Sequence, residues 1–254
     1  MSHARKKRRR RRGNNVLWYF LFLLLLTVGL IVAAAVFFRV KYIDVRTETN
    51  LYTSEEITEA SGIRLEESLF TLNKEKYAGN IEKKLPYIEH AVIRVQYPAT
   101  VKIDITVANP AGVLKAGDDF YLISDKAKVL GKVDPADDLI KNSSLPILVF
   151  GDIPKPETGQ KMQFPDDTVE QIYFQLRSIL QQNGVTQLTQ IDMTSRLKMK
   201  ITWEDRLEIT LGSQLELEKK LKKLKKMCTE NILPSEHGTI DATDAEYISF
   251  LKNN

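Results

Sequence analysis

One uninterrupted apolar stretch, Val16 to Phe38, constrains this chain more than any other feature of its sequence. It is 23 residues long and contains no charged side chain. A helix of that length reaches about 34 Å, and the hydrocarbon core of a bilayer is about 30 Å thick. Because an isolated segment in lipid must pair its backbone polar groups internally, we predict one transmembrane helix over residues 16–38.

The residues on either side of this stretch indicate its direction in the membrane. Eight consecutive cations (RKKRRRRR) occupy positions 5–12, whereas only Arg39 and Lys41 directly follow the stretch. The positive-inside rule therefore places residues 1–15 in the cytoplasm, as a basic tail, and residues 39–254 outside the membrane. The cations that carry this topology prediction are Arg8, Arg9, Arg10, Arg11 and Arg12.

Two alternative interpretations apply to this N-terminal region. A basic run is also typical of nucleic-acid binding or nuclear targeting, but a predicted span three residues away favours a role in orientation, with contact to anionic headgroups compatible.

Ala33-Ala34-Ala35 resembles a signal-peptidase site. Cleavable apolar regions run about 7–15 residues, so we favour an uncleaved anchor. A mature chain that begins at Val36 would contradict it.

Charge and cysteine content describe the predicted extracytoplasmic part. The basic tail contributes eight positive charges to a formal net charge of +4, so the remaining chain is net acidic. The single cysteine, Cys228, excludes an internal disulfide. Extracytoplasmic domains without disulfides are more typical of a Gram-positive or similar bacterial envelope than of a secreted eukaryotic protein.

Residues 39–109 contain the pattern of a small α+β unit. Thr53 precedes Glu56 by three residues, as in a capping box, and Pro86 is expected to end the second helix. Two segments of alternating apolar and polar residues then form a hairpin with one apolar face. The expected elements are a strand over 40–46, helices over 54–61 and 73–85, and strands over 91–97 and 101–107.

The motifs within this unit resemble the POTRA domain of the FtsQ/DivIB family of bacterial cell-division proteins. The resemblance rests on a Leu-Pro-Tyr-apolar step at 85–88 and a Tyr-Pro-x-Thr turn at 97–100. The motif residues are Pro86, Tyr87, Tyr97, Pro98 and Thr100. One departure is Ala108-Asn109-Pro110, where the family often has Glu-Arg-x-Pro, so this chain lacks a surface charge pair at the domain junction.

Residues 110–254 are predicted to form a second domain that resembles the β domain of the same family. Hydrophobic periodicity indicates an amphipathic helix around residues 169–180 and another over 214–231. The expected strands are 120–124, 128–130, 145–151, 188–193, 197–203, 207–212, 238–241 and 246–251, with Leu197 on the apolar face of its strand. The predicted fold class is α+β, with one transmembrane helix, a β-α-α-β-β POTRA domain and a mixed domain rich in antiparallel strands.

No catalytic or metal-binding pattern is recognisable in the sequence. The three histidines, His3, His90 and His237, have no metal-ligand spacing, and the chain lacks a phosphate-binding glycine loop. Cys228 and His237 are a conceivable nucleophile–base pair, but Cys228 lies on an apolar helix stripe, where a cysteine behaves as a small hydrophobe. The acidic pairs 137–138 and 166–167 fit solvated turns. We expect no enzyme activity, cofactor, metal, small-molecule substrate or nucleic acid.

The last predicted helix carries a lysine run over residues 219–226. Such a run is a possible contact for anionic wall polymer or lipid. A solvated helix face, opposite an apolar stripe turned to the core, is the more common arrangement and is the one we favour. The lysines are Lys219, Lys220, Lys222, Lys223, Lys225 and Lys226.

The resemblance implies a non-enzymatic scaffold of the divisome in the cell membrane at the division septum. Its implied partners are two bitopic coiled-coil proteins, of the FtsL type and the FtsB/DivIC type, through which it influences septal peptidoglycan synthesis. Short terminal strands favour a sheet edge to which a partner segment adds a strand. The expected partner-binding residues are Thr239, Ile240, Asp241, Tyr247, Ile248 and Phe250.

Two other functions compete with this one. A POTRA-bearing protein that guides polypeptides during secretion or membrane insertion is the first, although such proteins commonly carry several POTRA units or a barrel. An envelope enzyme with an unrecognised site is the second.

Overall fold

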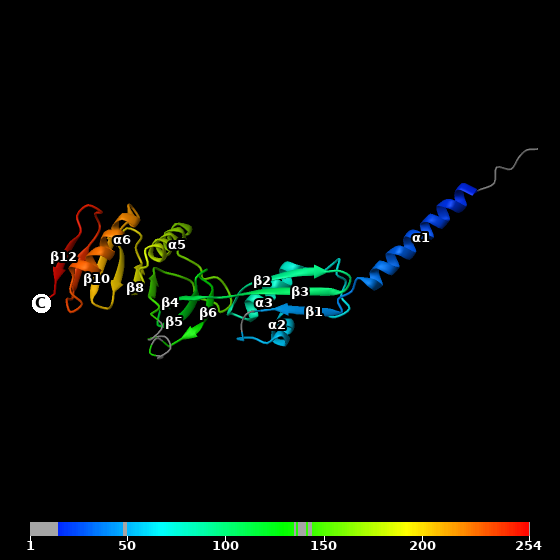
Figure 1. The fold of residues 1–254 in the computed structure, drawn as a ribbon, viewed down its shortest axis with the longest axis horizontal. Coiled ribbons are helices and arrows are strands. Elements are labelled where there is room, and N and C mark those ends of the chain that lie inside the picture. The colour runs from blue at the N-terminus through cyan, green and yellow to red at the C-terminus, as the bar shows by residue number, and fades with distance from the viewer. Residues whose placement is uncertain (1–14, 48–49, 135, 137–140, 142–143, 254) are drawn as a thin grey trace, which may run out of the picture.

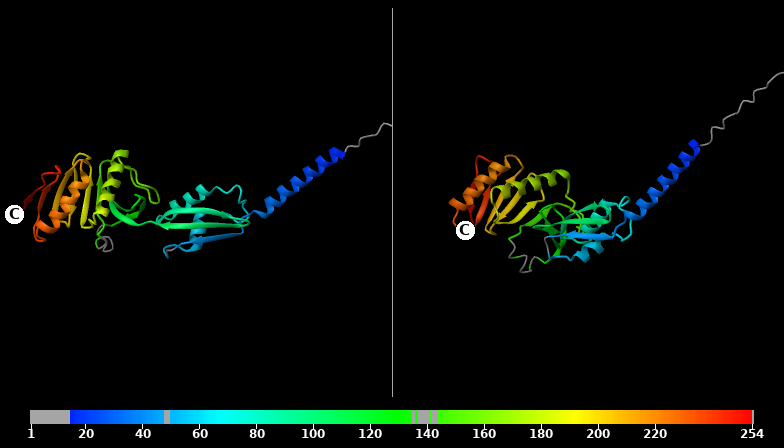
Figure 2. Two further views of the ribbon diagram at one scale, coloured as in Figure 1. Left: turned by 45° about the horizontal axis from the view of Figure 1, so that its top comes forward. Right: turned by 45° about the vertical axis from the view of Figure 1, so that its right-hand side comes forward.

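The computed structural model describes residues 15–47, 50–134, 136, 141 and 144–253. Three parts follow one another along the long axis of the molecule, and the C-terminus lies at the end opposite the first helix (Figures 1 and 2). The first part is a long helix, the second a three-stranded sheet with two helices, and the third a nine-stranded sheet with two helices. The predicted topology residues 8–12 and the acidic pair 137–138 lie outside the described residues.

The first helix, α1 (Asn15–Phe37), is long and apolar enough to cross a membrane. It begins and ends one residue earlier than expected. No side chain in its most apolar window is buried against the rest of the described chain. The helix therefore has no protein core of its own to pack against.

The second part is built on a sheet of order β1-β3-β2. The hairpin β2 (Ile88–Gln96) and β3 (Thr100–Val107) pairs antiparallel, and β1 (Tyr42–Arg46) lies parallel to β3. The expected alternation is confirmed: Ile93 and Ile103 face each other in the core, while their neighbours Arg94 and Lys102 face outward.

Two helices cover the apolar face of this sheet. At α2 (Ser54–Ser61), Thr53 and Glu56 form the expected capping box, and Gly62 ends the helix in a left-handed conformation with φ of 75°. The second helix, α3 (Lys74–Lys84), begins at the Asn73 cap and ends before Pro86, as predicted. The helices and the sheet enclose one core.

The third part has nine strands in the order β12-β11-β10-β9-β8-β7-β4-β5-β6. The pairs β4–β7, β7–β8 and β10–β11 are parallel and the remaining five are antiparallel. The strands are β4 (Pro110–Ala116), β5 (Asp119–Ser124), β6 (Val129–Val133), β7 (Ile147–Phe150), β8 (Leu188–Met193), β9 (Met199–Trp203), β10 (Leu207–Gly212), β11 (Gly238–Asp241) and β12 (Ser249–Lys252).

The helices α5 (Asp167–Gln182) and α6 (Leu217–Lys226) contribute to one large core with this sheet. The chain continues from α6 into a π-helical turn, η1 (Met227–Asn231), which contains the buried Cys228. Apolar stripes at helical spacing explain the burial of both helices, as predicted.

Several strand boundaries differ from the sequence prediction, and the strand β4 (Pro110–Ala116) was not predicted. Two of the differences move the start of a strand. Leu197 is 71% exposed because β9 begins only at Met199, after a turn closed by the Lys198 N–H and the Ser195 carbonyl (3.0 Å). The last strand, β12, begins at Ser249 and not at Glu246. In both cases a local turn replaces the start of an alternating pattern.

A small third core joins the two sheets. Tyr87, from the predicted POTRA motif, packs with Val113, Leu122 and Leu130 on the face of β4–β6 that α5 and α6 leave open. Lys128, buried beside this core, donates from Nζ to the carbonyls of Glu82 (2.7 Å) and Ile88. The junction is therefore a packed contact between the two parts.

Candidate partner-binding edge

The nine-stranded sheet has two edge strands: β12, and β6, whose first residue Val129 is bonded to the 159–160 segment. The prediction that Thr239, Ile240 and Asp241 lie on an open edge is wrong, because β11 pairs in parallel with β10 and antiparallel with β12. Within the described residues, no strand pairs with the outer side of β12. Whether a partner binds there stays a prediction.

The pairing of β12 shows which backbone groups are free to accept a partner strand. The Asn253 N–H donates to the His237 carbonyl at 2.9 Å, and Phe250 and Lys252 lie opposite Ile240 and Gly238. In an antiparallel pair, hydrogen-bonded residues alternate with residues whose N–H and C=O point the other way. The backbone groups of Phe250 and Lys252 therefore point away from β11.

The predicted side chains around this edge differ in exposure. Tyr247 is 83% exposed and precedes β12, and Leu251 within the strand is 70% exposed. Ile248 and Phe250 are half-buried against the main core, with the Phe250 ring over the α-carbon of Gly238. The edge thus combines free backbone groups with two exposed apolar side chains, which is suited to strand addition.

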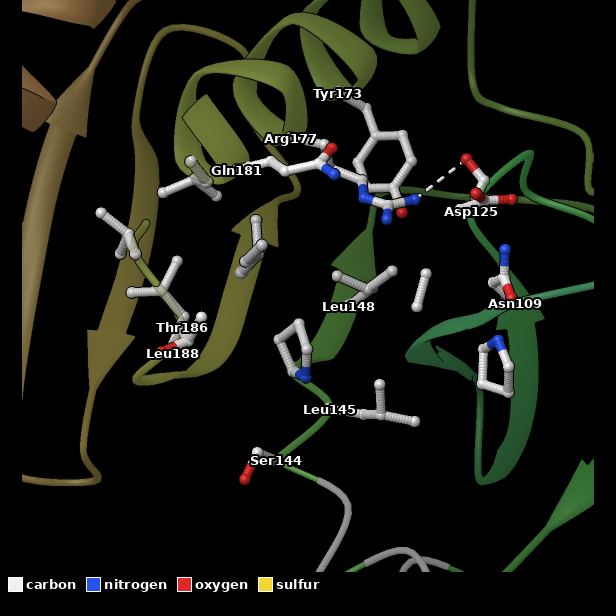
Figure 3. A pocket seen from close by; sticks show the side chains of 16 residues that line it. Asn109, Asp125, Ser144, Leu145, Leu148, Tyr173, Arg177, Gln181, Thr186 and Leu188 are labelled. Carbon is white, nitrogen blue, oxygen red and sulfur yellow. Dashed lines mark hydrogen bonds between the residues drawn. The ribbon is translucent and has the colours of Figure 1, made fainter. Parts of the chain in front are cut away.

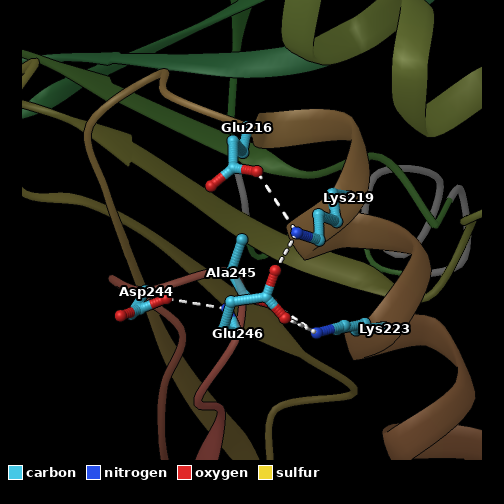
Figure 4. Close-up of polar contacts among 6 residues, drawn as sticks. All are labelled: Glu216, Lys219, Lys223, Asp244, Ala245 and Glu246. Carbon is cyan, nitrogen blue, oxygen red and sulfur yellow. Dashed lines mark hydrogen bonds and ion pairs between the residues drawn. The ribbon is translucent and has the colours of Figure 1, made fainter.

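The loop before β12 is held by the lysine-rich helix (Figure 4). The Glu246 carboxylate bonds to Lys219 Nζ and lies 3.2 Å from Lys223 Nζ, which also donates to the Ala245 carbonyl at 2.6 Å. The two ammonium groups, Lys219 first, lower the pKa of Glu246. The Glu246 N–H is bonded to Asp244 Oδ1 at 2.7 Å. These contacts fix the approach of the chain to its last strand.

The lysine run is therefore only partly the solvated face that we favoured. Lys220 is 2% exposed and donates from Nζ to the carbonyls of Leu211 (2.9 Å) and Ser213 (3.3 Å), and burial lowers its pKa. Lys222 pairs with Glu218 on the surface at 2.6 Å. The role of Glu246 had no sequence signal, because the residue was predicted to begin the last strand and its partners Lys219 and Lys223 lie 27 and 23 positions away.

A cavity of about 560 Å³ lies between α5 and the adjoining ends of β4, β7 and β8 (Figure 3). Its lining mixes apolar side chains such as Leu148 and Leu188 with polar ones such as Arg177. Arg177 donates to the Asp125 carbonyl at 3.0 Å and lies 5.8 Å from the Tyr173 ring centre. No sequence motif indicates this cavity, because helical spacing only places Tyr173 on the core face of α5.

The groups considered as catalytic candidates in the sequence have surroundings that fit a structural role. Cys228 is buried in the core, and this burial raises the pKa of its thiol to about 11. Asp166 accepts from the Val169 N–H at 2.9 Å as the cap of α5, which lowers its pKa. Among the described residues, no three His, Cys, Asp or Glu side chains gather as a metal site.

The POTRA motif residues fall into two groups. Pro86 and Tyr87 lie at the junction with the nine-stranded sheet, where the Tyr87 carbonyl accepts from the Ala108 N–H at 2.9 Å. Tyr97, Pro98 and Thr100 form the β2–β3 turn at the other end, next to α1 (Figure 1).

Comparison with known proteins identifies these two parts. Residues 38–106 match the FtsQ-type POTRA domain, and residues 112–248 match the model described as cell division protein FtsQ/DivIB, C-terminal. The chain belongs to the FtsQ/DivIB family of cell division proteins. It therefore contains an FtsQ-type POTRA domain and a strand-rich FtsQ/DivIB C-terminal domain.

Two curated relatives support the same assignment. The cell division protein DivIB of Clostridium acetobutylicum is 25% identical over 209 residues, covering 82% of this chain and 80% of that protein. DivIB of Clostridium botulinum is 27% identical over 186 residues, covering 73% and 70%. Both matches extend over most of each protein, as expected for a shared domain order.

Proposed function

We propose that this FtsQ/DivIB family member is a non-enzymatic scaffold of the divisome, anchored by α1 with its tail in the cytoplasm and its two domains outside. It acts at the division septum by binding FtsL-type and FtsB/DivIC-type bitopic proteins, and through them it influences septal peptidoglycan synthesis. The observation that carries this proposal is the open edge of β12, with outward backbone groups at Phe250 and Lys252.

Strand addition gives this proposal a backbone-level test. Proline at an edge position removes an N–H that has no partner in the free protein, and edge strands tolerate it on the solvent side. Lys252→Pro should therefore leave the domain folded but weaken partner binding at least tenfold, whereas Lys252→Ala keeps the N–H and should bind as the parent does. Binding of the full chain, in detergent, to a purified FtsB/DivIC-type partner measures both.

The possible outcomes distinguish a wrong binding site from a wrong function. Equal binding by both variants would move the partner site away from β12, and loss of binding by both would assign the effect to the lysine side chain. No binding by the parent chain would contradict the scaffold proposal. In that case, crosslinking in the native membrane to nascent secreted polypeptides would test the alternative secretion role.

A further inference from the structure

The POTRA domain follows α1 without a free linker. The Phe38 N–H still donates to the Ala34 carbonyl at 3.0 Å, so the last helical bond extends past Phe37. The next residues pair at once with the 66–69 segment: Leu69 N–H to Phe38 O (3.0 Å), Val40 N–H to Glu67 O (2.9 Å) and Glu66 N–H to Val40 O (2.8 Å). The end of the span is thus bonded into the domain.

An aromatic cluster lies at this junction. The ring centres of Phe70 and Tyr97 lie 5.1 and 5.5 Å from that of Phe38 and 5.9 Å from each other. Phe70 and Tyr97 are nevertheless 59% and 55% exposed. The two rings therefore present apolar surface at the end of the domain that adjoins α1.

Other exposed apolar residues gather at the same end. Tyr42 and Leu65 are both more than 60% exposed, and the segments that carry them join here through the Tyr42 N–H to the Ala99 carbonyl and the Val40–Glu66 bond. In the described part of the POTRA domain, the other exposed large apolar residue is Leu51, at 57%, beyond the far end of β1. Because the exposed apolar residues are concentrated at one end of the domain, we look for a binding surface that meets this end only.

The geometry of the span identifies that binding surface. A helix of 23 residues is about 34 Å long, so its end lies just outside a hydrocarbon core of about 30 Å. The headgroup layer adds about 5–7 Å on each side, a depth comparable to the spacing of the three rings. Tyrosine favours this layer, and the neighbouring Arg39 and Lys41 suit anionic headgroups.

We propose that the tip of the POTRA domain, formed by Tyr42, Leu65, Phe70 and Tyr97, inserts into the headgroup layer of an anionic phospholipid bilayer and holds the domain at a fixed angle to it. This inference rests on the membrane anchoring in the proposed function. It adds a second, peripheral membrane contact to the one made by α1. The rings act as anchors, and the hydrogen-bonded junction transmits their position to the sheet.

Depth-dependent quenching tests this contact. The full chain, with Cys228→Ala and a single new cysteine, is labelled with an environment-sensitive fluorophore in nanodiscs of phosphatidylethanolamine and phosphatidylglycerol. A label at Thr71→Cys, next to the tip, should be quenched by lipids that carry a headgroup-level spin label. The matched control is Thr106→Cys, which is exposed near the far end of β3, six residues or about 20 Å from Thr100, and should not be quenched.

A ring-deletion variant shows whether the side chains themselves make the contact. In the Thr71→Cys background, Phe70→Ser with Tyr97→Ser should reduce the quenching at least twofold, and the thermal transition checks that the domain remains folded. Equal quenching at positions 71 and 106, in a chain that remains in the nanodisc, would contradict insertion of the tip but not anchoring by α1. The exposed rings would then be assigned to contact with another protein. Unchanged quenching in the double variant would overturn the role of the rings. Failure of the chain to remain with the disc would overturn the anchor itself.

Discussion

The lysines of α6 have several different surroundings, which include a bond from Lys225 Nζ to the Asn183 carbonyl at the end of α5. Lys220 is buried and bonds to two backbone carbonyls, Lys219 and Lys223 hold Glu246, and Lys222 makes a surface pair. Charge alone favours solvent for all six lysines, although helical spacing places Lys220 on the same stripe as Leu217, Leu221 and Leu224. The difference arises because Lys220 lies above the end of β10, where two carbonyls without strand partners need a donor.

Removal of the buried lysine should cost stability in a way that its neighbour does not. Lys220→Ala leaves the carbonyls of Leu211 and Ser213 buried without their donor, and we expect a loss of about 1–3 kcal/mol in the free energy of unfolding. Lys222→Ala removes only an exposed pair and should change it by less than about 0.5 kcal/mol. Urea unfolding measures both, and equal losses would contradict the assignment.

Glu246 should titrate below its ordinary range. Lys219 and Lys223 lower the pKa of Glu246 in the folded chain. The stabilisation from these ion pairs is therefore fully present above pH 4.5, the ordinary pKa, and is lost as the pH falls through the lower pKa of the folded chain. Carboxyl-carbon NMR of the folded protein should give a titration midpoint for Glu246 below pH 4.5. In the double variant Lys219→Ala, Lys223→Ala this midpoint should return to about 4.5. A midpoint at or above 4.5 in the parent would contradict the lysine contacts.

At the scale of elements, most of the fold was predictable because its signals are local. Alternation in β2 and β3, the Thr53 and Asn73 caps and the apolar stripe of α5 each act within a few residues, and all are confirmed. Strand order was not predictable, because β11 joins β10 across α6. Antiparallel pairing with β12 on the other side of β11 then places Thr239–Asp241 inside the sheet, and β12 forms this edge.

The junction of the two domains offers a test at the same scale. Lys128 donates to the carbonyls of Glu82 and Ile88, so Lys128→Met should loosen the junction while each core remains folded. In a Cys228→Ala background, spin labels at Thr106 and Lys198 should then show a broader distance distribution by pulsed electron paramagnetic resonance.

Lys126→Met is the matched control for this junction, because Lys126 is exposed in the same turn. Its distance distribution should equal that of the parent. A distribution that is equally narrow in the Lys128 and Lys126 variants would show that the Tyr87 core alone holds the domains together.

On the scale of the whole molecule, the two proposed contacts lie at opposite ends of the part of the chain that follows α1. The POTRA tip lies at the end of α1, and the β12 edge lies at the other end of the molecule (Figure 2). Packed junctions on both sides of the POTRA domain join these ends. A partner that binds β12 is therefore held at a distance from the membrane set by the protein, which is the property required of a scaffold.

Site-resolved amide exchange tests the central claim, strand addition at β12, most directly. In the free chain, the outward N–H groups of Phe250 and Lys252 should exchange quickly, while that of Leu251, directed toward β11, exchanges slowly. Saturation with an FtsB/DivIC-type partner should slow exchange at Phe250 and Lys252 at least tenfold and leave Leu251 little changed. Full binding with unchanged exchange at those two amides would contradict the account.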